Sequence, residues 1–266
     1  MNLIKLILFL GLLLPKAVSP PPEDALCGIR NTTTKGGEEI SYSVYYALAG
    51  VYVEAGRAKF SNSLETFDGR PVYHVVGTGG SLESYDWIYK VRDRYESYID
   101  TATMKPLQFA RDVSEGKTKK QELVKFYHAA GTALNGKTTI RIPYCVQDVQ
   151  SMVYNARNID FSKYKKNDKI PFHLFLENEV HSLYLRYLGK ETVKTKYGTF
   201  KTIKFKPLLV AGTIFNGGED MMVWVSDDAL KLPVRIESKI LVGSIKVDMM
   251  GYKGLRGPLS GLVKKK

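Results

Sequence analysis

Short runs of alternating apolar and polar residues, with turn residues about every 8–12 positions, dominate this chain. The first run spans Ser41 to Leu48, and its apolar residues Tyr42, Val44 and Tyr46 occupy every second position. Because successive side chains of a β-strand point to opposite faces, this period predicts strands with one apolar face. Strands do not alternate with long helices. The pattern therefore predicts a mainly β fold, a large curved antiparallel sheet (barrel or half-barrel) with one or two short helices.

Turn and helix signals interrupt the strands at defined points. Asp68-Gly69 and Asn135-Gly136 have the chemistry of two-residue hairpin turns. Residues 148–158 instead carry apolar side chains at 149, 152, 153 and 156, which is the spacing of one helical face. Asp148 is placed to cap that helix, and we expect a second, weaker helix at 82–88.

The first residues have the order of a secretory signal. Lys5 precedes an apolar run from Leu6 to Leu14, and small residues follow as far as Ser19. This run is too short to cross about 30 Å of hydrocarbon as a helix. We expect residues 1–19 to be a signal peptide, 20–36 a linker and N-terminal segment, and 37–266 a single β-rich domain of an exported protein.

The chain contains two cysteines, Cys27 and Cys145. In an oxidising compartment, one pair predicts one disulfide with a single possible connectivity. A lipid anchor on Cys27 is not expected, because Leu26 stands where a lipoprotein signal needs a small residue. Two free buried thiols remain the alternative.

The chain is basic, with 39 Lys and Arg against 27 Asp and Glu, a formal net charge of +12. Most lysines are scattered through strand-like sequence, as at Lys194, Lys196 and Lys201, and the tight run is 264–266. Scattered lysines are typical of solvated sheet faces that resist edge pairing. We expect no nucleic-acid partner, while an anionic envelope surface stays open as a partner.

The residues predict no catalytic group, metal site or cofactor. No nucleophile motif accompanies the four histidines, which are His74, His128, His173 and His181. His173 and His181 lie near Glu177 and Glu179, a set that could bind zinc. With a two-residue turn at 178–179, however, His173 would face Tyr184, and the two imidazoles would not converge.

The densest polar and aromatic cluster spans 85–98. In its strand part, Arg92, Arg94 and Glu96 share one face, opposite to Asp93. Same-face arginines beside a glutamate indicate either an ion-pair ladder on a wet face or a lined binding groove. Asp86 completes the polar cluster that we single out as a candidate site.

Four segments resemble a bacterial envelope family, domain of unknown function 3108. They are residues 37–46, 85–97, 144–149 and 224–238. The likeness covers nearly the whole mature chain. It implies an exported protein of the periplasm or cell envelope of a Gram-negative bacterium, and it implies no activity. The last segment, a Trp-Val-Ser strand followed by Leu-Pro-Val-Arg-Ile-Glu, is also similar to periplasmic lipoprotein-carrier proteins, whose sheets curl around an apolar cavity closed by helices.

The leading functional hypothesis is a non-catalytic envelope protein that binds an apolar or amphipathic ligand, such as a lipid, in the concave face of the sheet. It predicts an uncharged inner stripe that includes Val44, Tyr46, Val223 and Trp224. The ligand-binding candidates are Tyr46, Tyr85, Trp87 and Trp224.

Two alternatives remain open. The first is a hydrolase acting on cell-wall or glycan material, with Asp86 and Asp93 as the two carboxylates that such chemistry needs across a cleft. The second is a basic scaffold that docks on anionic envelope components, with binding that weakens as salt rises.

Overall fold

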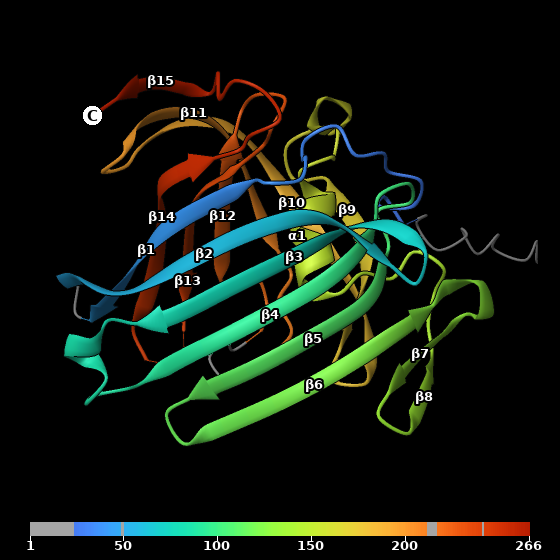
Figure 1. The fold of residues 1–266 in the computed structure, drawn as a ribbon. Helices are drawn as coiled ribbons and strands as arrows, with labels where there is room; N and C mark the ends of the chain where they lie inside the picture. The colour runs from blue at the N-terminus through green and yellow to red at the C-terminus, as the bar shows by residue number, and fades with distance from the viewer. Residues whose placement is uncertain (1–23, 49–50, 212–216, 241) are drawn as a thin grey trace, which may run out of the picture.

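The computed structural model describes residues 24–48, 51–211, 217–240 and 242–266 (Figure 1). The predicted signal peptide, 1–19, and the first residues of the expected linker lie outside the described residues. Within them, the strands join one antiparallel sheet of 15 strands. The prediction of a mainly β, curved antiparallel sheet is confirmed.

The strands follow one another mainly as hairpins. The first eight are β1 (Glu39–Leu48), β2 (Val51–Phe67), β3 (Arg70–Ser81), β4 (Val91–Asp100), β5 (Pro106–Glu115), β6 (Thr118–Tyr127), β7 (Thr132–Asn135) and β8 (Thr138–Arg141). The others are β9 (Lys169–Leu176), β10 (Glu179–Lys194), β11 (Gly198–Pro207), β12 (Met221–Ser226), β13 (Pro233–Lys239), β14 (Ser244–Lys253) and β15 (Leu262–Lys265). The β2–β3 turn is the predicted one, and Asp68 and Gly69 both have positive φ, 48° and 74°.

The sheet curls so that its two ends approach each other. Its order runs β8-β7-β6-β5-β4-β3-β2-β1-β14-β13-β12-β11-β10-β9, with β15 added to β11. The end strands β8 and β9 do not pair with each other. Instead Gln147 bridges to β9, donating its backbone N–H to His173 and accepting from Phe175 at 2.9 and 2.8 Å. Val146 packs with Phe126 and Phe175, which links β9 to β6 through side chains.

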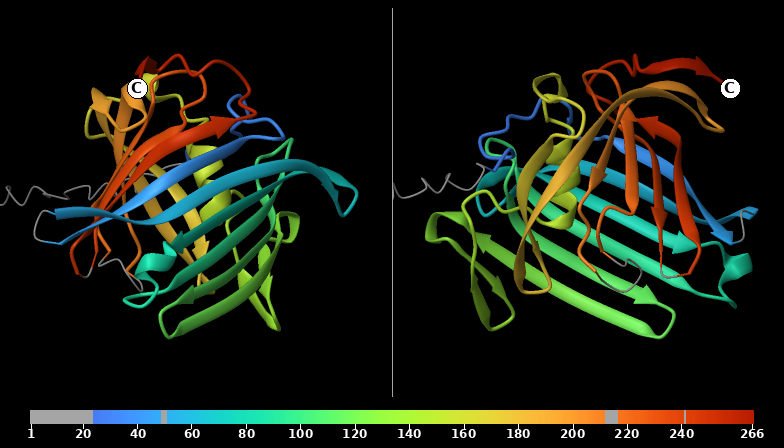
Figure 2. Two further views of the ribbon diagram at one scale, coloured as in Figure 1. Left: turned by 60° about the vertical axis from the view of Figure 1, so that its left-hand side comes forward. Right: turned by 180° about the vertical axis from the view of Figure 1, so that it is seen from behind.

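One α-helix, α1 (Val149–Ala156), lies inside the curve of the sheet, where it packs against β3, β4 and β9 (Figures 1 and 2). The predicted helix at 148–158 is therefore confirmed. Asp148 caps it by accepting hydrogen bonds from the backbone N–H groups of Gln150 and Ser151, both at 2.8 Å. No helix in the described part of the chain is long and apolar enough to cross a bilayer.

The expected second helix at 82–88 is wrong in type. The structure has only a short 3-10 helix there, η1 (Glu83–Tyr85), followed by turns. Two more 3-10 helices are η2 (His128–Ala130) and η3 (Phe161–Lys163). A run this short has few apolar residues to bury, so its regular structure ends after one turn.

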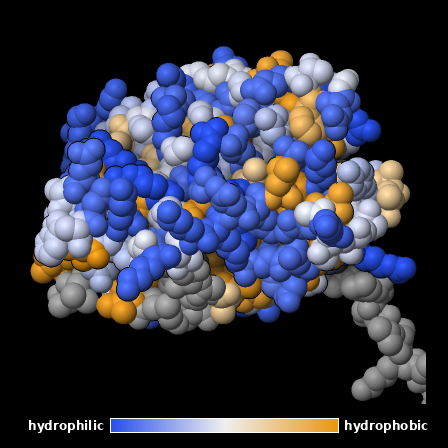
Figure 3. Space-filling model, turned by 60° about the horizontal axis from the view of Figure 1, so that its bottom comes forward, coloured by the Kyte–Doolittle hydropathy of each residue, from blue (hydrophilic) through white to orange (hydrophobic). Residues whose placement is uncertain are grey.

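The disulfide between Cys27 and Cys145 is present, with a Cα–Cα distance of 5.3 Å. It ties the N-terminal segment to the residues that lead into α1. The end of the molecule at the bottom of Figure 1 is mainly hydrophilic, with hydrophobic residues in small separate groups (Figure 3).

Candidate functional site

The interior around α1 is the candidate site, because the helix is packed in an unusual way. Its polar residues Gln150, Ser151 and Asn155 are buried, whereas Met152 and Val153 are only partly buried. A helix beside a core normally buries its apolar side and leaves its polar side in water. Here the polar side lies against the wall of the sheet, and part of the apolar side remains accessible.

A network of hydrogen bonds holds the polar side to the wall. Ser97 of β4 donates to the Asp148 carboxylate at 2.6 Å. The Asn155 amide donates to the carbonyl of Met104, in the turn after β4, at 2.8 Å and to the side chain of Gln147 at 2.9 Å. Because buried polar groups are costly without partners, these bonds fix the rotation of the helix about its axis.

Asp148 is a fully buried carboxyl group in this network. Burial raises its pKa to about 6, although hydrogen bonds from Ser97 and from the backbone of Ser151 and Gln150 act in the opposite direction. The helix cap therefore carries a group that changes its charge close to neutral pH.

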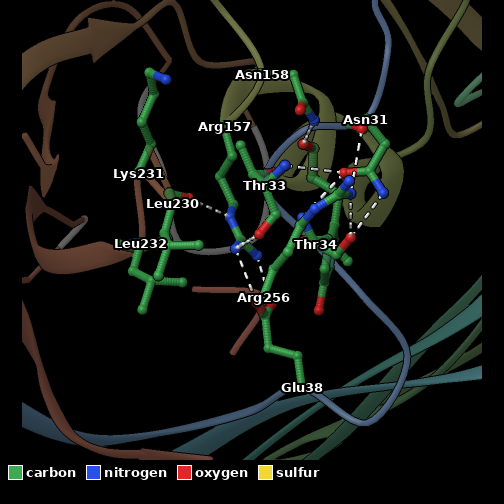
Figure 4. Close-up of polar contacts among 12 residues, drawn as sticks. Asn31, Thr33, Thr34, Glu38, Arg157, Asn158, Leu230, Lys231, Leu232 and Arg256 are labelled. Atoms are coloured by element: carbon green, nitrogen blue, oxygen red, sulfur yellow. Dashed lines mark hydrogen bonds and ion pairs between the residues drawn. The ribbon is translucent and has the colours of Figure 1, made fainter. Parts of the chain in front are cut away.

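The other end of α1 is held by Arg157, which follows the helix (Figure 4). Its guanidinium donates two hydrogen bonds to Glu38, at 2.6 and 2.9 Å. It also donates to the carbonyls of Leu230 and Thr33 at 3.1 and 3.3 Å. The two charged side chains are 2% and 0% exposed, so the pair satisfies its own charge inside the protein.

Residues of the N-terminal segment lie beside Arg157 (Figure 4). Asn31 accepts hydrogen bonds from the backbone of Thr33 and Thr34 at 3.1 and 3.0 Å, which makes a compact turn. Arg256 donates to the carbonyls of Asn31 and Thr34. With the disulfide and Arg157, these contacts close one end of the curved sheet.

A small apolar pocket separates α1 from the wall that faces it. It has a volume of about 60 Å³, and its lining includes Val153 of the helix with Tyr42, Phe60, Ile236 and Val247 of β1, β2, β13 and β14. The guanidinium of Arg157 also borders it, with its charge already paired. The pocket is thus lined mainly by apolar groups, and the charge of Arg157, its one charged lining residue, is paired with Glu38.

Further apolar side chains of the interior are also only partly buried. Leu174, Met221 and Ile236 pack on the same core cluster as Met152, and Tyr95 packs on the cluster that holds Val149. Partly buried apolar residues on several strands therefore pack on the same clusters as the apolar residues of the helix. An apolar molecule that covered them would remove hydrocarbon surface from water.

The predicted inner stripe is partly wrong. Val223 joins the interior cluster, but Trp224 lies on the opposite face of β12, because neighbouring residues of a strand alternate. The indole N–H of Trp224 donates to Glu191 at 2.5 Å, and the Lys204 ammonium lies 5.0 Å from its ring centre. Tyr46 lies at the end of β1 and donates its hydroxyl to the Val242 carbonyl at 3.3 Å.

The other aromatic candidates, Tyr85 and Trp87, lie on the loop between β3 and β4. Tyr85 ends η1, and Trp87 is 83% exposed with its indole N–H bonded to the Ser84 carbonyl at 3.0 Å. Nothing in these contacts places either ring in the pocket beside α1.

The polar cluster divides into two groups. Asp86 accepts from Ser81 at 2.5 Å and from Arg92 at 2.6 Å, and these bonds hold the pKa of Asp86 below its ordinary value. Arg94 pairs instead with Glu96 at 2.7 Å. The structure therefore brings Asp86 and Arg92 together and leaves Arg94 in a separate pair.

Asp93 does not join Asp86. It accepts from the Ser114 backbone at 3.1 Å, and burial raises its pKa. It alternates with Arg92 along β4, so it points to the opposite face from the arginine that holds Asp86. Asp86 and Asp93, the two carboxylates considered for a hydrolase, therefore do not face each other across a cleft, so this pair cannot serve as the catalytic pair of a hydrolase.

A larger groove of about 500 Å³ lies on the outer face of β4 to β7. Ala110 and Leu123 contribute apolar surface, and Arg94 and Asp112 are among its charged lining residues. Arg94 is paired with Glu96, and Asp112 accepts a hydrogen bond from Gln121 at 3.1 Å. These charges are satisfied within the protein.

The histidines do not build a metal centre. The β9–β10 turn is Glu177-Asn178, so His173 lies opposite Ser182 rather than Tyr184, and it contacts Asp24 at 3.1 Å. Within the part of the chain that the structure describes, no group of three or more His, Cys, Asp or Glu side chains is placed to hold a metal ion.

Comparison with known proteins identifies the family and the fold. The family model described as protein of unknown function, DUF3108, matches residues 41–250. A crystal structure described as a β-barrel-like protein of domain of unknown function DUF1849 from Brucella abortus is similar with a TM-score of 0.55 and 8% identity, over 83% of this chain and 98% of that chain. At this identity the likeness supports the fold alone.

A "putative lipoprotein" from Parabacteroides distasonis matches with a TM-score of 0.39 and 12% identity, over 85% of this chain and 99% of that chain. A "putative exported protein" from Bacteroides fragilis matches with a TM-score of 0.33 and 12% identity, over 86% and 100%. These TM-scores are too low to support an argument. No curated protein is similar enough in sequence to match.

Proposed function

The chain belongs to the DUF3108 family of proteins of unknown function, and on that premise we propose that it is an exported, non-catalytic protein that binds an apolar or amphipathic, lipid-like ligand against α1. The packing of this helix is the observation that carries the proposal. Gln150, Ser151 and Asn155 are buried against the wall of the sheet, while Met152 and Val153 stay partly exposed inside it.

The free energy of binding would come from covering these apolar groups. Burial of apolar surface stabilises a complex by about 25 cal/mol for each Å² removed from water. The walls around α1 offer such surface on Leu174, Met221 and Ile236. The ion pair of Arg157 and Glu38 leaves no free charge beside the pocket that an apolar ligand would have to bury.

The size of the pocket favours a chain-like ligand. A volume of about 60 Å³ is far below the ~300–1,000 Å³ of most small-molecule sites. A narrow hydrocarbon chain could place one end beside Val153 and lie along the half-exposed side chains for the rest of its length. A bulky ring system would not fit without a rearrangement of the helix.

Export is supported by the disulfide and by the predicted signal. A bond between Cys27 and Cys145 persists in the periplasm or outside the cell, and is rare in a reducing cytoplasm. The resemblance to an envelope family favours the same location. In the envelope, a carrier or sensor of an apolar molecule needs an interior shielded from water.

A pair of matched valine substitutions tests this function. Val153→Phe would fill the pocket beside the helix, whereas Val263→Phe adds the same atoms to an exposed position of β15. With a fluorescent fatty acid as the probe, we expect Val153→Phe to weaken binding at least about tenfold and Val263→Phe to leave it unchanged. Equal binding by the two variants, or no binding by the unmodified chain, would overturn the proposal.

A further inference from the structure

Three loops come together at one end of the curved sheet. The β1–β2 hairpin, the β3–β4 loop and the β13–β14 turn belong to neighbouring strands in the order β4-β3-β2-β1-β14-β13. Leu82 donates its backbone N–H to Ala55 at 2.8 Å, which places the β3–β4 loop beside the start of β2. The hydrogen bond from Tyr46 to Val242 places the β13–β14 turn beside the end of β1.

The first residues of β2, the β3–β4 loop and the β13–β14 turn expose large apolar side chains, which we call the rim. Its members are Val51, Tyr52, Val53, Trp87, Ile88, Tyr89 and Val242. Trp87 is 83% exposed, Val51 67% and Val242 64%. In the described part of the chain, more than half of the exposed large hydrophobic side chains belong to the rim. Such a concentration on a protein surface marks a site of interaction.

Lysines surround the rim. They are Lys90, Lys117, Lys119, Lys239 and Lys246. None of them forms an ion pair with a carboxylate among the residues that the structure describes. The Lys246 ammonium lies 4.1 Å from the ring centre of Tyr52, and the Tyr89 ring packs beside Gly116 in the turn that carries Lys117. Glu54 and Asp86 also lie beside the rim, but they form ion pairs with Arg57 and Arg92. Glu83 and Glu115 are two further acids in these segments, against five lysines, so positive charge is in excess.

The rim and α1 lie at different positions along the same strands. The helix contacts the wall near Gly77, Ser97 and Tyr42, whereas the rim continues from Ser81, Val91 and Tyr46 at the other ends of the same strands. The apolar side chains of the rim therefore lie away from α1 along these strands.

We infer that the rim docks on the surface of a lipid bilayer that contains anionic lipids. Trp and Tyr rings favour the boundary between headgroups and hydrocarbon, where an apolar body and a polar edge are both satisfied. Valine and isoleucine at loop tips can enter the hydrocarbon beside them. The surrounding lysines are attracted to the negative surface potential of the lipid.

The shape of the rim favours a bilayer over a folded protein. The apolar side chains belong to three separate segments, which are the first residues of β2, the β3–β4 loop and the β13–β14 turn. A fluid surface can accept separate segments, whereas a stable protein interface needs about 800 Å² of matched surface on each partner. The inference rests on the outer loops alone and does not require a ligand beside α1.

Tryptophan fluorescence gives a direct test, because Trp87 and Trp224 are the two tryptophans of the chain. Trp224 is buried at 5% exposure, so its emission should not respond to lipid. With vesicles of phosphatidylethanolamine and phosphatidylglycerol whose acyl chains are brominated, we expect part of the emission of the full chain to be quenched. Trp87→Phe should remove that quenched part. Emission that is not quenched, or quenching that persists in Trp87→Phe, would overturn the inference.

Binding of the same vesicles adds a matched comparison. Trp87→Ser combined with Val242→Ser should weaken co-sedimentation with the anionic vesicles about tenfold or more. Leu64→Ser combined with Val263→Ser, which also alters exposed apolar residues but away from the rim, should not. The predicted signal peptide, residues 1–19, is the same in every variant, so any contribution it makes to co-sedimentation is the same in all of them. Equal losses in the two double variants would contradict docking through the rim.

The two proposals fail separately. The rim variants should still bind the fluorescent fatty acid, because Val153 and the pocket are unchanged. Val153→Phe should still bind vesicles. If the unmodified chain binds vesicles but no fatty acid, the proposed ligand site is rejected and the docking of the rim stands. If it binds the fatty acid but no vesicles, the docking of the rim is rejected and the ligand site stands.

Discussion

Arg157 and Glu38 form a fully buried ion pair between the end of α1 and the residue before β1, with hydrogen bonds of 2.6 and 2.9 Å. The two residues are 119 positions apart in the sequence. The pair fixes the helix inside the sheet, and Arg157 extends the contact to the Leu230 carbonyl of the β12–β13 connection. The position of the candidate site therefore depends on it.

Removal of one partner of this pair should be costly. Glu38→Ala leaves a buried guanidinium without its counter-charge, and we expect a loss of about 3–5 kcal/mol in the free energy of unfolding. Glu39→Ala, at the next position, removes ion pairs with Lys59 and Lys253 near the surface and should cost about 1 kcal/mol. Urea titrations of both variants measure the difference, and equal losses would show that the buried pair does not hold the helix.

The disulfide should stabilise the closed end of the molecule. Its cysteines are 118 residues apart, and the chain-entropy model gives a loop of this length about 4–5 kcal/mol as an upper value. Cys27→Ser with Cys145→Ser should therefore lower the urea midpoint while the far-ultraviolet circular dichroism of the native sheet is kept. A midpoint unchanged by the substitutions would contradict a stabilising role.

Asp148 should make stability depend on pH between about 4 and 6. Its pKa rises from 3.8 to about 6 because the folded protein buries it. In this interval the unfolded chain has lost the proton that the folded protein keeps, so the free energy of unfolding falls as pH rises. A shift of about two pKa units corresponds to about 3 kcal/mol in the free energy of unfolding. This stabilisation is present below pH 4 and is lost as pH rises through about 6.

Asp148→Asn isolates this effect, because asparagine also caps helices but does not ionise. The free energy of unfolding of the variant, relative to the unmodified protein, should increase as pH rises from 4 to 7. Urea titrations across this range provide the measurement. A difference between the two proteins that does not change with pH would show that the carboxyl group does not titrate as the structure implies.

The local features of the fold could be predicted from the sequence. Strands, the turn at Asp68-Gly69 and the start of α1 at Asp148 depend on neighbouring residues, so alternation and capping chemistry reveal them. The disulfide could be predicted because two cysteines allow one pairing. The secondary structure of residues 82–88 could not be predicted, because one turn of 3-10 helix is too short to show a periodic pattern that identifies its type.

The site depends on partners that are distant in the sequence. The apolar spacing of α1 suggests that its apolar side is buried, but Ser97 and the Met104 carbonyl turn the polar side to the wall. Arginine and glutamate are usually exposed, so the sequence gives no reason to bury Arg157 and Glu38. The sequence around either residue does not indicate that the two side chains meet. Val223 and Trp224 cannot both face the interior of a regular strand, because neighbouring residues alternate, and Trp224 lies on the face opposite to Val223.

Cysteine labelling on α1 tests the central claim most directly. The native cysteines are joined in the disulfide, so a cysteine introduced at Val153 or Ser151 can be followed by its reaction with a small thiol reagent. We predict that Val153→Cys reacts in the folded protein and is protected by a fatty acid, while Ser151→Cys, two residues away, does not react. Rapid reaction at Ser151→Cys with slow reaction at Val153→Cys would mean that the helix presents its polar side to the interior, and would contradict the account.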